Sequence, residues 1–419
     1  MDKFVIEGGK TLKGEIKVSG SKNATLPILA ATLLTDGVCE IRNIPKLRDT
    51  LTMCKLLRSL GKTVEIGPHR VIISGSVNNH VADYKLVSTM RGSFCVLGPL
   101  LAKLGKAKVS MPGGCVIGVR PIDLHMKGIS ALGVKSNFEG GYVYAAANRL
   151  KGAEMYLGGT FGSSVLATAN VMMAASLAHG ETVIESAACE PEIEELGNFL
   201  SSMGAKINGQ GTPRIVINGV RKLNGISYKM GSDRIEAGTF LLLAAAAKSD
   251  ILVKDAQYNQ LLALIDKLQS IGVDVHKEGA DIRVKCKKTL RPANIVTHPH
   301  PGFPTDLQAQ YMALMAITPG VSIITDRVFP DRFMHIAELN RMGAAIRRDA
   351  GVAIVEGVKK LYGAPVMASD LRASAALVIA GLVAHGKTEI YRIYHLDRGY
   401  EDLDGKLTNI GAKVYREKE

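Results

Sequence analysis

A cysteine in a glycine-rich loop is the most reactive group that the sequence offers. Cys115 follows Pro112, Gly113 and Gly114 in the segment MPGGCVIGVRPIDLH, and Arg120 lies five residues further on. Proline and glycine at these positions predict a loop that exposes its backbone and can move. Arg120 is expected to lower the pKa of the thiol below its ordinary value of about 8.5, which would suit a nucleophile or a general acid.

Cysteine–histidine catalysis is the obvious competitor, but the spacing identifies no partner, and His125 on the following helix is only a weak candidate. The other cysteines occur at positions 39, 54, 95, 189 and 286 without any CxxC pair. They are expected to be small buried apolar residues of a protein from a reducing compartment.

Cations recur where apolar helices are predicted to begin. The residues at the six helix starts are Lys22, Arg91, Ser164, Arg234, Asp306 and Arg372. A helix N-terminus carries a positive partial charge, so a cation there is unfavourable by about 0.3–1 kcal/mol. Taken singly, each cation is best explained as a solvated loop residue. Taken as a set, they predict a site for phosphate and carboxylate groups.

Arginines also precede the second helix of several repeats, at positions 48, 120, 332 and 398, and repetition would direct them toward one region. Asp306 is the acidic exception among the helix starts. Either Thr305 or Asp306 would serve as an ordinary helix cap. Among cations, the Asp306 carboxylate would instead have a lowered pKa and accept a proton from a substrate hydroxyl.

Two other groups of polar residues have simpler explanations. Asp233 and Glu236 have the spacing of a capping box, which is at least as good an explanation as a catalytic carboxylate pair. His298 and His300 lie between prolines with no third metal ligand nearby, so they are interpreted as loop structure.

Six copies of one unit must position these groups. A helical stretch that ends in an apolar residue and glycine recurs, with the glycines 72, 71, 68, 71 and 68 residues apart at positions 61, 133, 204, 272, 343 and 411. Each repeat is predicted to hold an apolar helix, a β-branched stretch and an amphipathic helix, which indicates an α/β fold. The first helices, such as 235–248 and 373–384, are apolar on nearly all sides and are expected inside the domains, with sheets around them.

Length and charge narrow the possibilities further. A chain of 419 residues suits two or three domains, and a boundary is predicted near residues 229–232. The net charge of +13 favours an anionic partner, but without Trp and with 5% aromatic residues a nucleic-acid surface is poorly supported. P-loop and dinucleotide-binding motifs are absent from the sequence. Because the sequence has neither a signal-like segment nor an apolar run long enough for a bilayer, a cytoplasmic protein is expected.

Eight motifs spread over essentially the whole chain closely resemble those of the UDP-N-acetylglucosamine 1-carboxyvinyltransferases, a family of enolpyruvyl transferases. They are SGSKNATLPILAA, MPGGCVIGVRPIDLH, EPEI, SDRIEAGTF, FPTDLQAQ, DRFMHIAEL, DLRASAALVIAG and HLDRGYED. The resemblance implies a two-domain inside-out α/β barrel of six repeated units, three per domain. Residues 1–21 and 232–419 would form one domain, and residues 22–231, with the Cys115 loop, the other.

The resemblance also implies the reaction, in which the enolpyruvyl group of phosphoenolpyruvate passes to the 3-hydroxyl of UDP-N-acetylglucosamine with release of phosphate. This is the first committed step of peptidoglycan synthesis. It requires no metal or organic cofactor and no nucleic acid or membrane, and it leaves protein partners open.

Individual residues take roles from the same resemblance. Cys115 would be the general acid, would form a covalent adduct with phosphoenolpyruvate and would be alkylated by fosfomycin. Asp306 would take the hydroxyl proton, and Lys22 and Arg398 would also be catalytic. The substrate-binding residues would be Lys22, Asn23, Arg91, Arg120, Pro121, Ile122, Asp123, Leu124, Ser164, Val165, Asp306, Val328, Arg332, Asp370, Arg372 and Arg398.

Three positions depart from the family pattern, namely Leu166, Cys189 and Ser232, where Gly, Arg and Pro are usual. Two rival functions would share part of this pattern. The sister enzymes that make 5-enolpyruvylshikimate 3-phosphate typically have Lys-Ser in place of Lys22-Asn23 and lack the cysteine loop. A non-catalytic scaffold or basic nucleic-acid binder would use the net charge, but it leaves the cations at the helix starts and Cys115 unexplained.

Overall fold

The computed structural model describes residues 2–113 and 122–418, which fall into two compact units. The terminal unit contains residues 2–19 and 232–418, and the middle unit contains residues 20–113 and 122–231. Each unit has its own continuous hydrophobic core. Within the described residues, no helix is both long enough and apolar enough to cross a membrane.

Each unit carries three four-stranded sheets with one common strand order. The sheets of the middle unit are β14(Ser227–Lys229)-β3(Cys39–Arg42)-β5(Arg70–Ser74)-β4(Thr63–Gly67), β6(Val81–Ala82)-β7(Lys106–Ser110)-β9(Tyr142–Ala146)-β8(Lys135–Glu139) and β10(Glu154–Tyr156)-β11(Glu181–Glu185)-β13(Arg214–Asn218)-β12(Lys206–Asn208). The sheets of the terminal unit are β2(Lys13–Lys17)-β15(Asp250–Lys254)-β17(Asp281–Lys285)-β16(Asp274–Glu278), β18(Ile295–Thr297)-β19(Val321–Asp326)-β21(Val352–Glu356)-β20(Ala345–Asp349) and β22(Pro365–Met367)-β23(Lys387–Tyr391)-β1(Asp2–Glu7)-β24(Lys413–Lys418).

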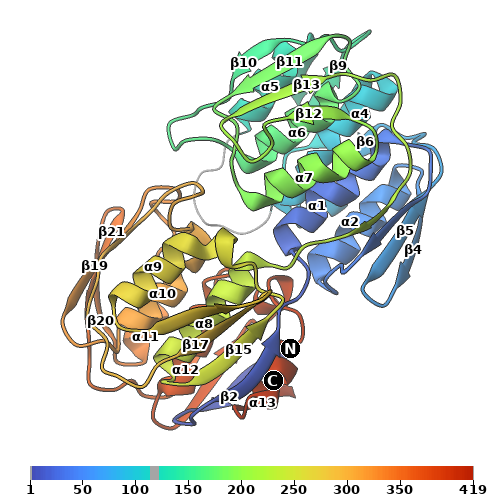
Figure 1. Ribbon diagram of the computed structural model, residues 1–419. Helices are drawn as coiled ribbons and strands as arrows, with labels where there is room; N and C mark the ends of the chain where they lie inside the picture. Colours follow the sequence, from blue (N-terminus) through green and yellow to red (C-terminus); the bar gives the residue numbers. More distant parts are fainter. Residues whose placement is uncertain (1, 114–121, 419) are drawn as a thin grey trace. The chain divides into compact units, whose positions relative to one another are not determined.

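In all six sheets the first two strands are parallel and the other neighbours are antiparallel. The N-terminal strand β1 completes the sheet of the last repeat, where Phe4 lies opposite Ile390 on β23 and Arg416 on β24. Both chain ends therefore lie in one sheet of the terminal unit (Figure 1).

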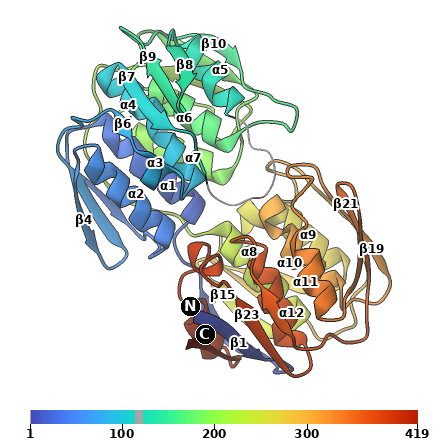
Figure 2. The same ribbon diagram turned by 180° about the vertical axis from the view of Figure 1, so that it is seen from behind.

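Six helical segments form the centres of the two units. They are α1(Lys22–Ala31), η2(Arg91–Val96) with α4(Leu97–Leu104), and α6(Val165–Ala175) in the middle unit, and α8(Arg234–Ala246), η4(Thr305–Leu307) with α10(Gln308–Met315), and α12(Ser374–Val383) in the terminal unit. All 13 residues of α8 are buried. Helices α8, α10 and α12 contact one another (Figure 2), so the prediction of apolar helices at the centre is confirmed.

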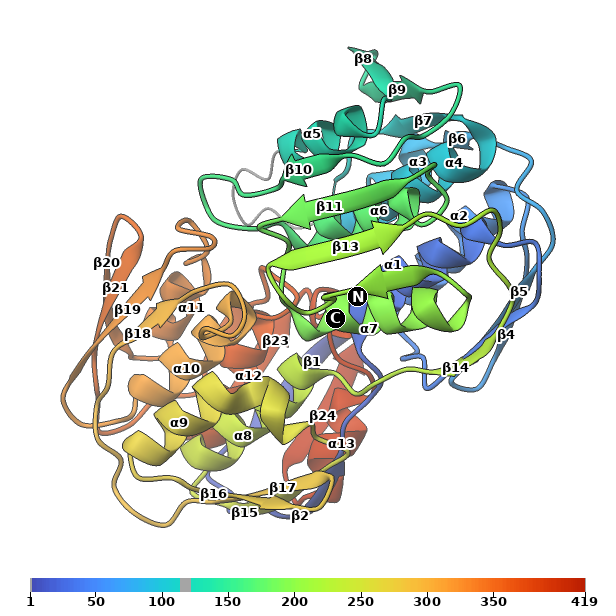
Figure 3. The ribbon, with the colours of Figure 1, turned by 45° about the horizontal axis from the view of Figure 1, so that its top comes forward.

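Six further helices are amphipathic and close the repeats: α2(Arg48–Ser59), α5(Asp123–Ala131), α7(Pro191–Ser202), α9(Leu262–Ser270), α11(His335–Arg341) and α13(Leu403–Asn409). The short helices η1(Thr32–Leu34), α3(Tyr84–Val87), η3(Tyr258–Leu261) and η5(Leu396–Arg398) lie between the main elements. Strands β11 and β13 pass over α6 in Figure 3, and contacts join α6 to β13 and α7 to β12. The helices are therefore inside and the sheets outside, as the inside-out prediction requires.

The six glycines that defined the repeats have one structural role. Each lies just beyond an amphipathic helix and has a positive φ, with values of 106°, 88°, 105°, 106°, 93° and 94° in chain order. A left-handed residue ends a helix and favours glycine because a Cβ would be strained there. The six-repeat prediction is thereby confirmed. Each sheet keeps two edge strands, so within the described residues the strands form separate sheets rather than a closed barrel.

Candidate functional site

Three of the predicted site residues form one ion-pair cluster in the terminal unit. Arg332 donates from Nε to Asp370 Oδ2 at 2.6 Å and from Nη2 to Asp370 Oδ1 at 3.0 Å. Its Nη1 donates to Asp306 Oδ1 at 2.6 Å. The planar guanidinium therefore binds Asp370 through two N–H groups and Asp306 through a third, and the bidentate geometry toward Asp370 is one that a lysine ammonium does not provide.

Burial strengthens the interaction between the Arg332 and Asp370 charges. The side chains of Arg332 and Asp370 are 5% and 1% exposed, whereas that of Asp306 is 26% exposed. Burial alone would raise the pKa of Asp370, but the Arg332 charge and hydrogen bonds from Arg332 and two backbone N–H groups lower it. Asp370 is therefore a buried ionised partner of Arg332, and Asp306 is the carboxylate of the cluster that solvent reaches.

The N-terminal end of α12 links this cluster to a second buried pair. Asp370 Oδ1 accepts hydrogen bonds from the N–H groups of Arg372 and Ala373. The Arg372 side chain donates from Nη2 to Asp233 Oδ2 at 2.7 Å and from Nη1 to the Gly399 carbonyl at 2.8 Å. Burial opposes the charge of Arg372, but Asp233 raises the pKa of the guanidinium above its ordinary value.

The capping box predicted for Asp233 and Glu236 is only half correct. Asp233 caps α8, because its Oδ1 accepts hydrogen bonds from Ile235 N and Glu236 N, both at 2.9 Å. Glu236 does not complete the box: its carboxylate accepts from Ser19 N at 2.7 Å and from Lys406 Nζ at 2.6 Å. The Glu236 carboxylate therefore pairs with Lys406 and does not cap α8. Asp233 caps the helix with Oδ1 and pairs with Arg372 through Oδ2.

The capping role considered for Thr305 and Asp306 is also corrected. Pro304 occupies the N-cap position of η4, with no side-chain capping hydrogen bond. Thr305 Oγ1 instead donates to Asp326 Oδ2 at 2.6 Å, and Asp306 pairs with Arg332. Asp306 is therefore held by a cation, as the alternative explanation required.

In the middle unit, Lys22 is the first residue of α1 and lies 3.3 Å from Asp49 Oδ2. Both side chains are buried. Lys22 and Arg372 thus each face a carboxylate from another element, which offsets the unfavourable helix-start charge. Ion pairing therefore supplies part of the stabilisation that the sequence alone did not suggest.

The other predicted residues of the middle unit lie at helix starts. Asn23 is on α1, Arg91 begins η2, Ile122 occupies the N-cap position of α5, Asp123 and Leu124 begin α5, Ser164 caps α6 and Val165 is its first residue. Ser164 Oγ accepts a hydrogen bond from Ala167 N at 3.4 Å. Cys115, Arg120 and Pro121 lie outside the described residues.

The remaining arginines of the set are arranged unequally. Arg332 is buried, Arg398 is half-buried at the end of η5, and Arg48 is exposed at the start of α2. Val328 lies beyond β19, where its N–H donates to Asp326 Oδ1 at 3.0 Å. Similar places in the repeats therefore did not give these arginines a common environment.

Cysteine and histidine outside the loop are structural. Cys39, Cys54, Cys95 and Cys286 are buried, as expected, whereas Cys189 is only half-buried. Burial raises the pKa of Cys95 to about 12. His125 is also buried, which lowers its pKa to about 3, and its Nδ1 lies 2.9 Å from Asn170 Nδ2. None of these six groups is poised for catalysis.

The three positions that depart from the family pattern are partly buried, and the two histidines between prolines lie in a loop. Leu166 packs partly buried against the core of the middle unit, and Cys189 and Ser232 are half-buried. His298 and His300 lie in a loop after β18. Among residues 2–113 and 122–418, no group of three or more His, Cys, Asp and Glu side chains is arranged to hold a metal ion.

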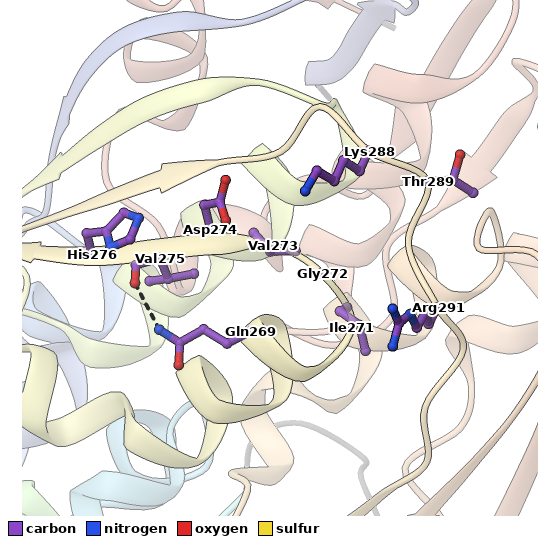
Figure 4. Close-up of a pocket in the computed structure, with 10 residues that line it drawn as sticks. All are labelled: Gln269, Ile271, Gly272, Val273, Asp274, Val275, His276, Lys288, Thr289 and Arg291. Carbon is purple, nitrogen blue, oxygen red and sulfur yellow. Dashed lines mark hydrogen bonds between the residues drawn. The ribbon is translucent and has the colours of Figure 1, made fainter.

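A separate polar pocket of about 310 Å³ lies in the terminal unit (Figure 4). Lys288 and Arg291 line it opposite Asp274, and the Gln269 amide donates to the Val275 carbonyl at 2.9 Å. None of the predicted site residues lines this pocket, so it is distinct from the ion-pair clusters.

The ion-pair clusters favour particular chemistry. A partly exposed carboxylate fixed by a buried arginine can accept a proton from a hydroxyl, and arginines anchored from behind can hold an anion. Sequence reasoning missed Asp49 and did not give Asp233 an arginine partner. It also missed Thr239, Gln310 and Tyr400. Gln310 donates to the Asp306 carbonyl, the Tyr400 ring lies against Arg372, and Thr239 contacts the Tyr400 hydroxyl. Asp49 lies next to Arg48 and Asp233 next to Arg234, and the motifs SDRIEAGTF, FPTDLQAQ and HLDRGYED contain Thr239, Gln310 and Tyr400, so these were the available signals.

Comparison with known proteins finds relatives that match almost the whole chain. A sequence profile of the family described as EPSP synthase (3-phosphoshikimate 1-carboxyvinyltransferase) matches residues 6–407. The UDP-N-acetylglucosamine 1-carboxyvinyltransferase of Methylacidiphilum infernorum is 50% identical over 416 residues, covering 99% of each chain. That of Lawsonia intracellularis is 52% identical over 419 residues, covering 100% of each chain.

A solved structure extends the likeness to the fold. The enolpyruvyl transferase NikO from Streptomyces tendae superposes with a TM-score of 0.89 at 23% identity, covering 99% of this chain and 98% of that chain. At this identity the likeness concerns the fold alone.

Proposed function

Because the chain belongs to the UDP-N-acetylglucosamine 1-carboxyvinyltransferases, a family of enolpyruvyl transferases, we propose that it transfers the enolpyruvyl group of phosphoenolpyruvate to the 3-hydroxyl of UDP-N-acetylglucosamine. Phosphate is released, and the reaction is the first committed step of peptidoglycan synthesis in the cytoplasm. The observation that carries this proposal is the sequence identity of 50% and 52% to two named relatives over nearly the full length of the chain.

The two compact units are proposed to be the two domains of this enzyme. Phosphoenolpyruvate is bound by Lys22, Asn23, Arg120, Arg332, Arg372 and Arg398. The nucleotide sugar is bound by the helix starts at Arg91, Ser164 and Val165, by residues 120–124, and by Asp306 and Val328. The buried Asp370 acts through Arg332, which it orients.

The proposed chemistry is an addition followed by an elimination. The Cys115 thiol gives a proton to the methylene carbon of phosphoenolpyruvate, which leaves positive charge at C2. The sugar hydroxyl oxygen bonds to C2 and its proton passes to Asp306. The C2–O bond to phosphate then breaks, and the methyl group returns a proton to the Cys115 thiolate, which restores the double bond. Guanidinium groups fixed by buried carboxylates stabilise the phosphate and carboxylate charges throughout.

Asp306 fits the role of base for a geometric reason. One carboxylate oxygen is held by Arg332 Nη1, and the side chain keeps 26% of its surface exposed. It is thus oriented by a partner while remaining accessible to a substrate, which a general base requires. Asp370, at 1% exposure, lacks that access.

Phosphate release from phosphoenolpyruvate tests the proposal with two acceptors. The full chain is expected to release phosphate with UDP-N-acetylglucosamine and none with shikimate 3-phosphate. The second acceptor is included because the matching family profile carries the EPSP synthase description. Release with shikimate 3-phosphate alone would replace the proposal with the sister reaction.

A pair of cysteine variants tests the catalytic assignment. Cys115→Ala should abolish phosphate release at neutral pH, because the proton donor is removed. Cys189→Ala is the matched control, since this half-buried thiol lies outside the proposed site, and its activity should stay within about twofold of wild type. Equal losses in both variants would refute the role of Cys115.

A further inference from the structure

We propose that Thr239, Gln310 and Tyr400 form a buried network that positions Asp306 and Arg372 for the reaction. This inference rests on the proposed function and adds three positioning residues to it. The three side chains come from α8, from α10 and from the segment after η5. They are 2%, 0% and 2% exposed, so they do not contact solvent.

Hydrogen bonds join the three side chains directly. The hydroxyl groups of Thr239 and Tyr400 lie 2.8 Å apart. Gln310 Nε2 lies 3.2 Å from the Tyr400 hydroxyl and 3.3 Å from Thr239 Oγ1. A network of this kind is rigid because each member limits the rotamers of the others.

The direction of these hydrogen bonds follows from counting protons. Thr239 Oγ1 donates its only proton to the Ile235 carbonyl at 2.8 Å, so the Tyr400 hydroxyl donates to Thr239. The Gln310 amino group then donates toward the Tyr400 hydroxyl and also to the Asp306 carbonyl at 2.9 Å. A single chain of donors therefore runs from the Asp306 backbone to α8.

Tyr400 connects this chain to Arg372. The Arg372 guanidinium carbon lies 5.1 Å from the centre of the Tyr400 ring, and Arg372 Nη1 donates to the carbonyl of the adjacent Gly399. Arg372 Nε has no hydrogen-bond partner within the described part of the chain. The position of the guanidinium therefore depends on its two Nη hydrogen bonds and on the ring beneath it.

Gln310 is poorly explained by stability alone. Its Oε1 is buried and has no hydrogen-bond partner among the described residues. A buried amide oxygen left unpaired is destabilising, and an apolar residue of similar volume would avoid that cost. Departures of this kind are expected where a residue serves function. The Gln310 amino group fixes the peptide that carries Asp306.

Two tyrosine variants separate positioning from simple destabilisation. Tyr400→Phe removes the hydroxyl and keeps the ring under Arg372. The matched control is Tyr311→Phe on the same helix as Gln310, because Tyr311 is also buried and donates to the Ala293 carbonyl at 3.1 Å. Tyr400→Phe should lower kcat/KM for phosphoenolpyruvate about tenfold, while Tyr311→Phe should stay within about twofold.

The Michaelis constants provide a readout that a structural role does not move. Misplacing Arg372 should raise the KM for phosphoenolpyruvate, whereas a smaller folded fraction lowers kcat alone. Thr239→Val should reproduce the effect of Tyr400→Phe, and Thr239→Ser, which keeps the hydroxyl, should restore activity. Equal effects of Tyr400→Phe and Tyr311→Phe, or full activity of Thr239→Val, would overturn the inference.

Hydrogen exchange distinguishes failure of the network from failure of the proposed function. In the substrate-free protein, amides of residues 305–310 and 396–402 should exchange faster in Tyr400→Phe than in Tyr311→Phe. Absent phosphate release by the wild type would reject the reaction. Unchanged exchange in these segments would reject the network, whatever reaction the protein catalyses.

Discussion

Replacing Asp370 with asparagine should destabilise the protein far more than the same change at a surface ion pair. Asp370 accepts two hydrogen bonds from Arg332, at 2.6 and 3.0 Å, and two more from backbone N–H groups, at 2.7 and 3.1 Å. Asp370→Asn removes the charge opposite a buried guanidinium and turns an amide N–H toward one of its donors. Removing one partner of a buried pair costs about 3–5 kcal/mol.

The control for this variant is Asp331→Asn. Asp331 is 72% exposed and pairs with Arg348 at 2.8 Å, and an exposed pair contributes about 0–1 kcal/mol. Urea unfolding of both variants at pH 7.5 measures the difference in the free energy of unfolding. Two losses that agree within about 1 kcal/mol would refute the account of the buried cluster.

The pH dependence of this difference has a definite sign. The folded protein lowers the pKa of Asp370 below its ordinary value of 3.8, so the unfolded chain binds this proton more readily. The stabilisation is complete above pH 3.8 and is lost as the pH falls toward the folded-state pKa. The gap between wild type and Asp370→Asn should therefore shrink in acid, and a gap that widened there would contradict the argument.

Three further outcomes are expected. Burial raises the pKa of Glu195 to about 7 from 4.5, so the folded protein loses stability as the pH rises through that interval. Glu195→Gln, which still accepts from Gly231 N, should raise the melting temperature by about 3 °C at pH 8.5 and leave it unchanged at pH 4.5. A larger increase at pH 4.5 than at pH 8.5 in calorimetry would count against the assignment. Asp306→Asn should lower kcat by about 10²–10⁴-fold in the phosphate assay, and an unchanged kcat would exclude it as the base. Gly411 has φ +94° with nothing within 4 Å of an added Cβ, so Gly411→Ala should cost about 1 kcal/mol through backbone strain alone, and a gain in urea stability would refute that reading.

Much of the fold could be predicted from the sequence because the determinants are local. Glycine at the end of an amphipathic helix and apolar residues on every face of a central helix leave periodic signals, and six copies of those signals reinforce one another. The four-stranded sheets were harder to predict. Short strands such as β10 and β22 have three residues each, and β1 completes the sheet of a repeat almost 400 residues away.

The candidate site was only partly predictable for a related reason. Residue types at helix starts identified Lys22, Arg372 and Asp306, but partners such as Asp49 and Asp233 depend on contacts between elements. Glu236 illustrates this dependence on tertiary contacts. Its spacing from Asp233 predicted a capping box, but its carboxylate pairs with Lys406. Tertiary contacts, which spacing does not encode, decide such cases.

Deuterium incorporation tests the proposed reaction most directly. The chain is incubated in D₂O with phosphoenolpyruvate and UDP-N-acetylglucosamine, and the sugar product is examined by mass spectrometry and NMR. Protonation of the methylene carbon followed by loss of a proton predicts an enolpyruvyl ether on the 3-oxygen with deuterium in its vinyl methylene. An enolpyruvyl product without deuterium would contradict the addition and elimination sequence, and an unmodified sugar would contradict the function itself.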